Sequence, residues 1–164
     1  MSPKFDSRGS LSARIAATFC SAGMIKIKND RQLAATKKWR ASFQEALAKA
    51  TQNSRNLHPR LHQAQVDGIR SQIKDLDTEI AEYQALRRSS PERIIVNSLE
   101  DLPAALVRLR IARRLTQDEL AQRLGVKPQQ VQRWEAGAYE RATYATICKV
   151  ADVLKIDLKG KPAK

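Results

Sequence analysis

The most restrictive feature of this sequence is a pair of helix signals, separated by one glycine, in the last third of the chain. Thr116 and Glu119 have the spacing of a capping box, in which each side chain bonds the other residue's backbone N–H, so a helix begins there. Gly125 supplies the left-handed conformation that ends a helix in a sharp turn. Pro128 suits the first turn of a following helix. Since small Ala121 lies beside the turn, the pattern predicts two short helices that cross at close range.

Flanking residues extend this pair to a small helical domain. Ser98 is followed three places later by Asp101, a capping sequence for a helix that ends near Arg114. A last helix is expected from Thr143 or Tyr144 onward. The residues expected in the core of this domain are Leu102, Leu106, Leu109, Leu120, Leu124, Val126, Val131, Trp134, Ile147, Val150, Ala151 and Leu154.

Two long helical patterns precede this domain. Asn29 and Asp30 are good N-cap residues for a helix over residues 30–51, and a second helix is expected over residues 59–88. In the first helix the expected inner residues are Leu33, Trp39, Phe43, Leu47 and Ala50. In the second they are Val66, Ile69, Ile73, Leu76, Ile80 and Tyr83, spaced like the seam of a coiled coil.

The seam of the second helix has two interpretations. The first helix folds back over it within the chain, or the seam pairs with a second chain. A two-helix hairpin buries little surface alone, and long apolar seams usually recruit a further partner. We therefore favour dimerisation through this segment.

Composition supports a helical, anion-binding protein. Only 5% of the residues are aromatic, whereas 42% are hydrophobic, which fits helices with a modest core. The formal net charge of +13 indicates an anionic partner, and the excess is spread along the chain. A membrane surface competes with nucleic acid for that role. No run approaches the roughly 18 apolar residues of a membrane span. Between the two partners we favour nucleic acid and expect no membrane partner.

The ends of the chain and its cysteines carry less information. Residues 1–28 are expected to be a disordered basic tail, and residues 157–164 a second basic tail. Met24 opens a stretch that looks like an ordinary protein start, which leaves open whether residues 1–23 belong to the functional unit. Cys20 and Cys148 have no metal-ligand spacing and indicate reduced thiols in a cytoplasmic protein.

The paired helices resemble a known family. Residues 115–135, with their capping box, Ala121, Gly125, Val126 and the Trp134–Glu135 ending, closely resemble the XRE-type (Cro/repressor) helix-turn-helix family. The resemblance covers residues 102–154. It implies a domain of five short helices with a recognition helix over residues 129–135. The expected fold class is thus all-α: a long helical hairpin or coiled coil followed by a five-helix Cro/repressor-like domain.

The resemblance also implies roles for particular residues. Gln129, Gln132 and Arg133 are expected to read base edges, because Gln pairs with adenine and Arg with guanine. Gln117 matches the family's phosphate-contacting glutamine. Further phosphate contacts are expected from Lys127, Gln130 and Arg141.

Arg110 and Glu135 match a pair that forms a buried ion bridge in the phage repressors, so we expect these side chains to meet. Two residues depart from the family pattern. Lys127 stands where the recognition helix usually has a Ser or Thr cap, and Pro128 stands where some members have a base-reading side chain. These departures bear on sequence specificity more than on the fold.

No feature indicates catalysis, a cofactor or a metal. The chain lacks a phosphate-binding loop, a nucleophile elbow and a zinc-protease motif. His58 and His62 are four residues apart, but Pro59 lies between them and no third ligand is near, which favours ordinary surface histidines. We expect a protein that is not an enzyme.

The expected organisation is a tail (1–28), a hairpin for dimerisation or partner binding (29–88), a linker (89–97), a DNA-binding domain (98–156) and a tail (157–164). The favoured function is a sequence-specific regulator, a repressor, that binds a pseudo-palindromic operator on double-stranded DNA as a homodimer. The alternative is an antitoxin that binds its toxin through the hairpin and represses its own operon. A third hypothesis is a chromatin- or membrane-associated basic protein, which sequence-independent binding would favour.

Overall fold

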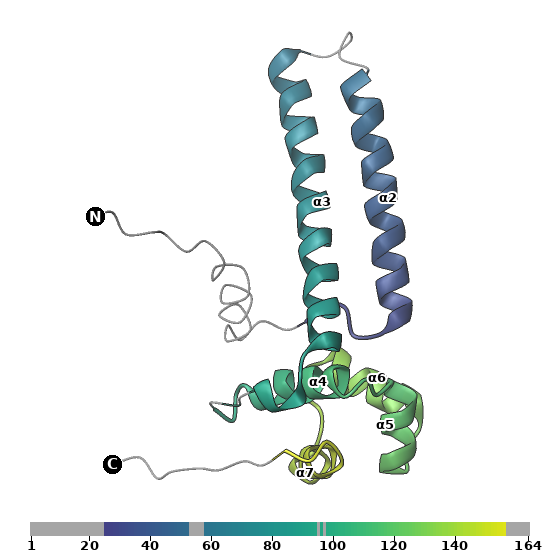
Figure 1. The fold of residues 1–164 in the computed structure, drawn as a ribbon, viewed down its shortest axis with the longest axis vertical. Helices are drawn as coiled ribbons and strands as arrows, with labels where there is room; N and C mark the ends of the chain where they lie inside the picture. Colours follow the sequence, from purple (N-terminus) through teal and green to yellow (C-terminus); the bar gives the residue numbers. More distant parts are fainter. Residues whose placement is uncertain (1–24, 53–57, 95, 97, 157–164) are drawn as a thin grey trace, which may run out of the picture.

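The computed structural model describes residues 25–52, 58–94, 96 and 98–156. Within these ranges the chain forms α-helices and one short 3-10 helix, with no strand. Two long helices stand side by side as a hairpin, and four shorter helices gather at its base (Figure 1). The all-α fold class, with long N-terminal helices before a C-terminal helical domain, is confirmed.

The hairpin consists of α2 (Asp30–Gln52) and α3 (Pro59–Arg88). The side chain of Asn29 accepts a bond from the backbone N–H of Gln32 at 2.8 Å, which caps the start of α2. Pro59 opens α3, where a missing N–H costs nothing, and the backbone of Ser89 leaves helical geometry to end it. Both helices lie within one residue of the ranges that the sequence predicts.

The contact between α2 and α3 runs along one stripe of each helix. On α2 the stripe comprises Leu33, Thr36, Arg40, Phe43, Leu47 and Ala50, all half-buried or buried. Arg40 forms an ion pair with Asp77 across the hairpin, and the hydroxyl of Tyr83 donates to Asp30 at 3.1 Å. The first helix therefore covers the seam of the second within one chain.

Trp39 is a correction to the predicted hairpin core. The sequence places this side chain inside, but it is 62% exposed. Neighbouring helix residues point about 100° apart, and the spacing of the stripe selects Arg40 rather than Trp39. Arg40 is half-buried there, and its guanidinium reaches Asp77 on α3.

The C-terminal helices are α4 (Leu102–Ala112), α5 (Gln117–Leu124), α6 (Pro128–Ala136) and α7 (Tyr144–Val153). A short 3-10 helix, η2 (Pro91–Arg93), leads toward them from the hairpin. Ser98 caps a turn before α4, since its hydroxyl accepts from the N–H of Asp101 at 3.2 Å. The resemblance implies five helices, and residues 102–156 form four α-helices with turns between α6 and α7.

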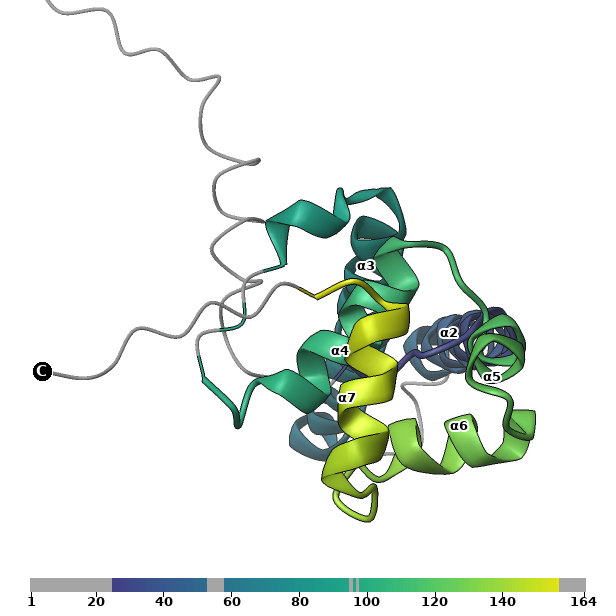
Figure 2. The same cartoon turned by 90° about the horizontal axis from the view of Figure 1, so that it is seen from below.

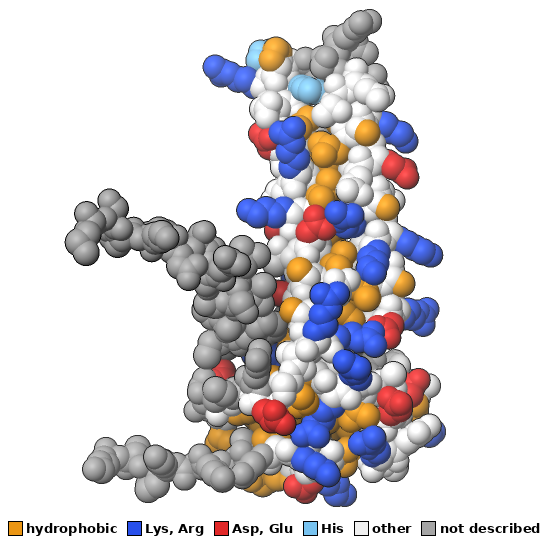
Figure 3. Space-filling model, viewed as in Figure 1, with side chains coloured by type: hydrophobic (Ala, Val, Ile, Leu, Met, Phe, Trp, Pro, Cys, Tyr) orange, Lys and Arg blue, Asp and Glu red, His pale blue; other side chains and the backbone are white. Residues whose placement is uncertain are grey.

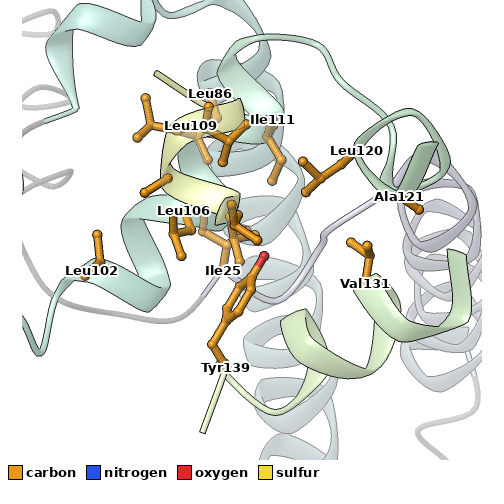
Figure 4. Close-up of a cluster of buried hydrophobic side chains, with 14 of the residues drawn as sticks. Ile25, Leu86, Leu102, Leu106, Leu109, Ile111, Leu120, Ala121, Val131 and Tyr139 are labelled. Carbon is orange, nitrogen blue, oxygen red and sulfur yellow. The ribbon is translucent and has the colours of Figure 1, made fainter. Parts of the chain in front are cut away.

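Apolar side chains from all four helices meet in one core. α7 lies across the domain with α4, α5 and α6 around it (Figure 2). Figure 4 shows Leu106, Leu120 and Val131 converging from α4, α5 and α6, and each is fully buried. Val150 and Leu154 complete this core at the end of α7. The predicted inward residues of the domain thus share one cluster.

A short segment before the hairpin also enters this core. Residues 25–29, here called the strap, bring Ile25 and Ile27 into the cluster, with 7% and 2% of their surface exposed. Lys28 is buried as well. The prediction that the basic tail extends to residue 28 is therefore wrong for residues 25–28, because Ile25 and Ile27 are covered by the helical domain. Residues 1–24 and 157–164 of the predicted tails lie outside the described residues.

Charge is distributed over both parts of the molecule. Figure 3 shows Lys and Arg side chains along the hairpin as well as on the C-terminal domain. Across the described ranges, no helix has the length and apolar character that crossing a membrane would require.

Candidate nucleic-acid interface

The first helix of the pair is fixed by its cap. The N–H of Glu119 donates to the Thr116 hydroxyl at 3.1 Å, and the N–H of Thr116 donates to the Glu119 carboxylate at 2.7 Å. The Thr116 hydroxyl also donates to this carboxylate at 3.0 Å. The bonds that the carboxylate accepts from the Thr116 N–H and, to a lesser degree, from the Thr116 hydroxyl hold the pKa of Glu119 below its ordinary value. Both halves of the capping box are present, so α5 begins where the sequence places it.

The turn between α5 and α6 depends on its glycine. Gly125 has a φ of +67°, the left-handed region in which a β-carbon is strained. The N–H of Val126 then bonds the carbonyl of Ala121 at 3.0 Å, and Ala121 is fully buried. The second helix therefore leaves the turn close to the first.

α6 separates buried from exposed side chains along its length. Val131 and Glu135, four residues apart, are fully buried against the domain. Gln129, Gln132 and Arg133 are exposed and lie together on the opposite side. The three predicted base readers are therefore neighbours on one free helix face.

The predicted phosphate contacts divide into two groups. Lys127, Gln130 and Arg141 are exposed at the start of α6, within it and in the turns after it. Lys127 occupies the N-cap position, and its side chain makes no capping bond. These three side chains are free to meet a DNA backbone.

Gln117 is the exception. It is 6% exposed, and its side-chain amide donates to the Glu135 carboxylate at 2.7 Å. Its carbonyl oxygen accepts from the Asn29 amide at 3.0 Å. Both ends of the amide are therefore engaged inside the protein, so this side chain has a structural role here, and its contact with phosphate stays a prediction.

Glu135 is the centre of a buried polar cluster. The guanidinium of Arg110 grips it in a two-point contact, with Nε at 2.5 Å from Oε1 and Nη2 at 2.7 Å from Oε2. Both side chains are almost wholly buried, 2% and 0% exposed. Two further Arg110 N–H groups bond the carbonyls of Leu115 and Lys28, each at 2.8 Å. The pair that the resemblance implies is thus in contact, and each partner makes further hydrogen bonds within the protein.

Lys28 adds a second cation to this cluster. Its ammonium donates to the main-chain carbonyl of Glu135. Burial lowers the pKa of Lys28, an effect that the negative charge of Glu135 opposes. The strap therefore contacts the end of the predicted recognition helix directly.

The strap is what sequence reasoning missed in this site. Alternation of Ile25 and Ile27 with Lys26 and Lys28 is the pattern of an extended segment with one covered face. That signal is short, and nothing in it identifies Glu135 or Gln117 as the groups that the strap contacts.

Two histidines and a tyrosine have structural contacts. His58 caps α3, since its ring accepts from the N–H of Arg60, and the ring of His62 lies 2.8 Å from the carbonyl of Ala50. Tyr139 stacks on Trp134 with ring centres 6.5 Å apart, and burial raises the pKa of its hydroxyl. Among the described residues, no group of three or more His, Cys, Asp or Glu side chains is placed to hold a metal ion.

Comparison with known families agrees with this geometry. A family model described as Helix-turn-helix matches residues 106–160, which include α5, the Gly125 turn and α6. The same comparisons find no match among curated proteins and none among solved structures.

The match defines the class of the C-terminal part: a helix-turn-helix domain, as found in DNA-binding transcription regulators. More particularly, this domain belongs to the XRE-type helix-turn-helix family. That family consists of DNA-binding regulators and is generally non-enzymatic.

Proposed function

We propose that this protein is a cytoplasmic, sequence-specific transcription regulator that acts as a dimer on a pseudo-palindromic operator. The observation that carries the proposal is the exposed face of α6, where Gln129, Gln132 and Arg133 stand together in a helix-turn-helix domain. A helix of this kind enters the major groove and presents such side chains to base edges. Repression follows when the bound dimer occludes a promoter.

Each proposed reader has a matching base. Arg133 forms a two-point contact with guanine, and Gln129 or Gln132 forms one with adenine, worth roughly 1–3 kcal/mol of discrimination each. Lys127, Gln130 and Arg141 bind phosphates and set the register of the helix on the duplex. Gln117 supports this surface indirectly, by holding Glu135 at the inner side of α6.

Two variants test these assignments. We expect Arg133→Ala to relax the preference for one base pair, while Lys127→Ala weakens binding to all sequences about equally. Binding of both variants is measured on the preferred duplex and on random duplexes across a salt series. Equal losses on both kinds of DNA for Arg133→Ala would refute its role as a base reader.

The antitoxin hypothesis differs in the partner of the hairpin. Trp39 is 62% exposed on α2, a surface suited to another protein chain. A regulator needs a second copy of itself there, whereas an antitoxin needs a toxin. A small toxin-like reading frame beside the gene, and a monomeric chain in solution, would favour the antitoxin.

A further inference from the structure

α2 carries a second stripe besides the one that contacts α3. Ala35, Trp39, Ser42 and Ala46 are spaced 4-3-4, the pattern of a helix seam, and none is charged. Trp39 and Ser42 are exposed, while Ala35 and Ala46 are half-buried. These four residues are called the Trp39 stripe.

A helix with one helical neighbour needs one seam. The contact with α3 uses the stripe that runs from Leu33 through Arg40 to Leu47, and the Trp39 stripe lies beside it. Two adjacent seams are typical of a helix that packs between two others. Within the described part of the chain, Trp39 remains 62% exposed.

We propose that the Trp39 stripe binds the same stripe of a second copy of this chain, with the two α2 helices antiparallel. This inference rests on the proposed dimer and identifies its interface. A register that places Trp39 opposite Ser42 of the second copy also places Ala35 opposite its Ala46. The bulky indole of Trp39 then packs against the small side chain of Ser42, and the serine hydroxyl can accept a hydrogen bond from the indole N–H. The surface is thus self-complementary, as a two-fold contact requires.

Charge at the edge of the stripe fits the same register. Lys38 and Glu45 are exposed and flank the stripe on one side, seven residues apart. Antiparallel pairing brings Lys38 beside Glu45 of the second copy, and symmetry repeats the pair. The next positions of the pattern, Gln32 and Lys49, are polar. A slip of seven residues in one direction would bury the Lys49 charge against Trp39, and a slip in the other direction would place Gln32 in the seam.

The register also matches the length of α2. The midpoint of the Trp39 stripe falls at the middle of the helix, so antiparallel copies overlap from Asp30 to Gln52. The two hairpin bases then lie about 30 Å apart along the helix axis, at 1.5 Å per residue. The C-terminal domains lie at the bases, beyond these ends (Figure 1). This spacing fits half-sites separated by one or more turns of DNA.

Sedimentation of the full chain over a concentration series tests the interface. We expect a reversible dimer that Trp39→Glu or Ser42→Glu weakens at least tenfold. Ala41→Glu is the matched control, because Ala41 is an exposed neighbour outside both stripes. Circular dichroism checks that all three variants keep the helical content of the parent.

A charge exchange tests the register. Lys38→Glu places two negative charges side by side, one on each copy at positions 38 and 45. It should weaken the dimer roughly 2- to 30-fold, the range for the loss of two exposed ion pairs. Adding Glu45→Lys to the same chain should restore it. Loss without restoration would overturn the antiparallel register.

The remaining outcomes are decisive as well. A chain that stays monomeric at every concentration overturns the proposal and leaves the stripe to a different protein. A dimer insensitive to Trp39→Glu places the interface elsewhere and also overturns it. If this dimer forms but no DNA sequence is preferred, the proposed function fails while the interface stands.

Discussion

At the scale of single residues, the domain depends on one buried anion. Glu135 accepts bonds from Arg110 and Gln117, and its main-chain carbonyl accepts from Lys28. These donors come from α4, α5 and the strap, so Glu135 joins three segments to α6, two through its carboxylate and the strap through its main-chain carbonyl. A buried charge is tolerated because every neighbour is a donor.

Glu135→Ala should therefore be severely destabilising. It leaves the Arg110 guanidinium buried without its partner, which costs about 3–5 kcal/mol of unfolding free energy. Urea denaturation measures the change. In contrast, Asp67→Ala removes only exposed contacts, the pair with Arg70 and the bonds from the Gln63 amide, and should cost at most about 1 kcal/mol. Similar losses for both variants would contradict the assigned role of the cluster.

The capping box predicts an acid-dependent contribution to stability. Because bonds from Thr116 lower the pKa of Glu119 in the folded state, its charged form stabilises the fold at pH values above the ordinary carboxyl range. This contribution is lost as the pH falls through the lowered pKa. Glu119→Gln should lack that part of the acid dependence, as measured by denaturation at several pH values. An unchanged pH profile would show that the box is not formed.

At the scale of elements, stop and start signals explain why the helix boundaries could be predicted. Pro59, Thr116, Gly125 and Pro128 act on the local backbone, so their effects need no knowledge of tertiary contacts. The side of α2 that faces α3 was harder to predict. Trp39 is the more apolar residue, but the spacing of the whole contact places Arg40 at the seam.

Two glycines allow a paired prediction about helix geometry. Gly125→Ala should cost about 1–2 kcal/mol, because its φ of +67° strains a β-carbon although no atom lies within 4 Å of it. Gly68→Ala lies inside α3 with equal space and an ordinary φ, so it should stabilise by up to about 1 kcal/mol. Thermal denaturation compares them, and changes of the same sign would contradict the described turn.

At the scale of the whole molecule, both ends of the hairpin are joined to the DNA-binding domain. The strap enters the core ahead of α2, and Tyr83 and Leu86 enter it from the end of α3. This attachment could not be predicted, because the two segments are far apart in sequence from Glu135 and the core. The sequence instead favours a free tail up to residue 28.

The attachment predicts that hairpin and domain unfold together. Ile27→Ala should lower the free energy of unfolding by roughly 2–5 kcal/mol, as for a buried large-to-small change. The loss should be the same for the hairpin and for the C-terminal domain. Unfolding is followed by helical content, to which the hairpin contributes, and by the fluorescence of Trp134 in the domain. A Trp39→Phe background removes the hairpin's own tryptophan signal. Coincident transitions are expected, whereas a hairpin that melts separately would contradict the joint core.

The central claim is that the exposed face of α6 reads a DNA sequence, and selection of bound duplexes from a random pool tests it most directly. The account predicts a palindromic consensus that the full chain binds far more tightly than random DNA, with strong salt dependence from phosphate contacts. Selection that enriches no sequence would contradict it, and would leave the helix-turn-helix domain without a demonstrated role in sequence recognition.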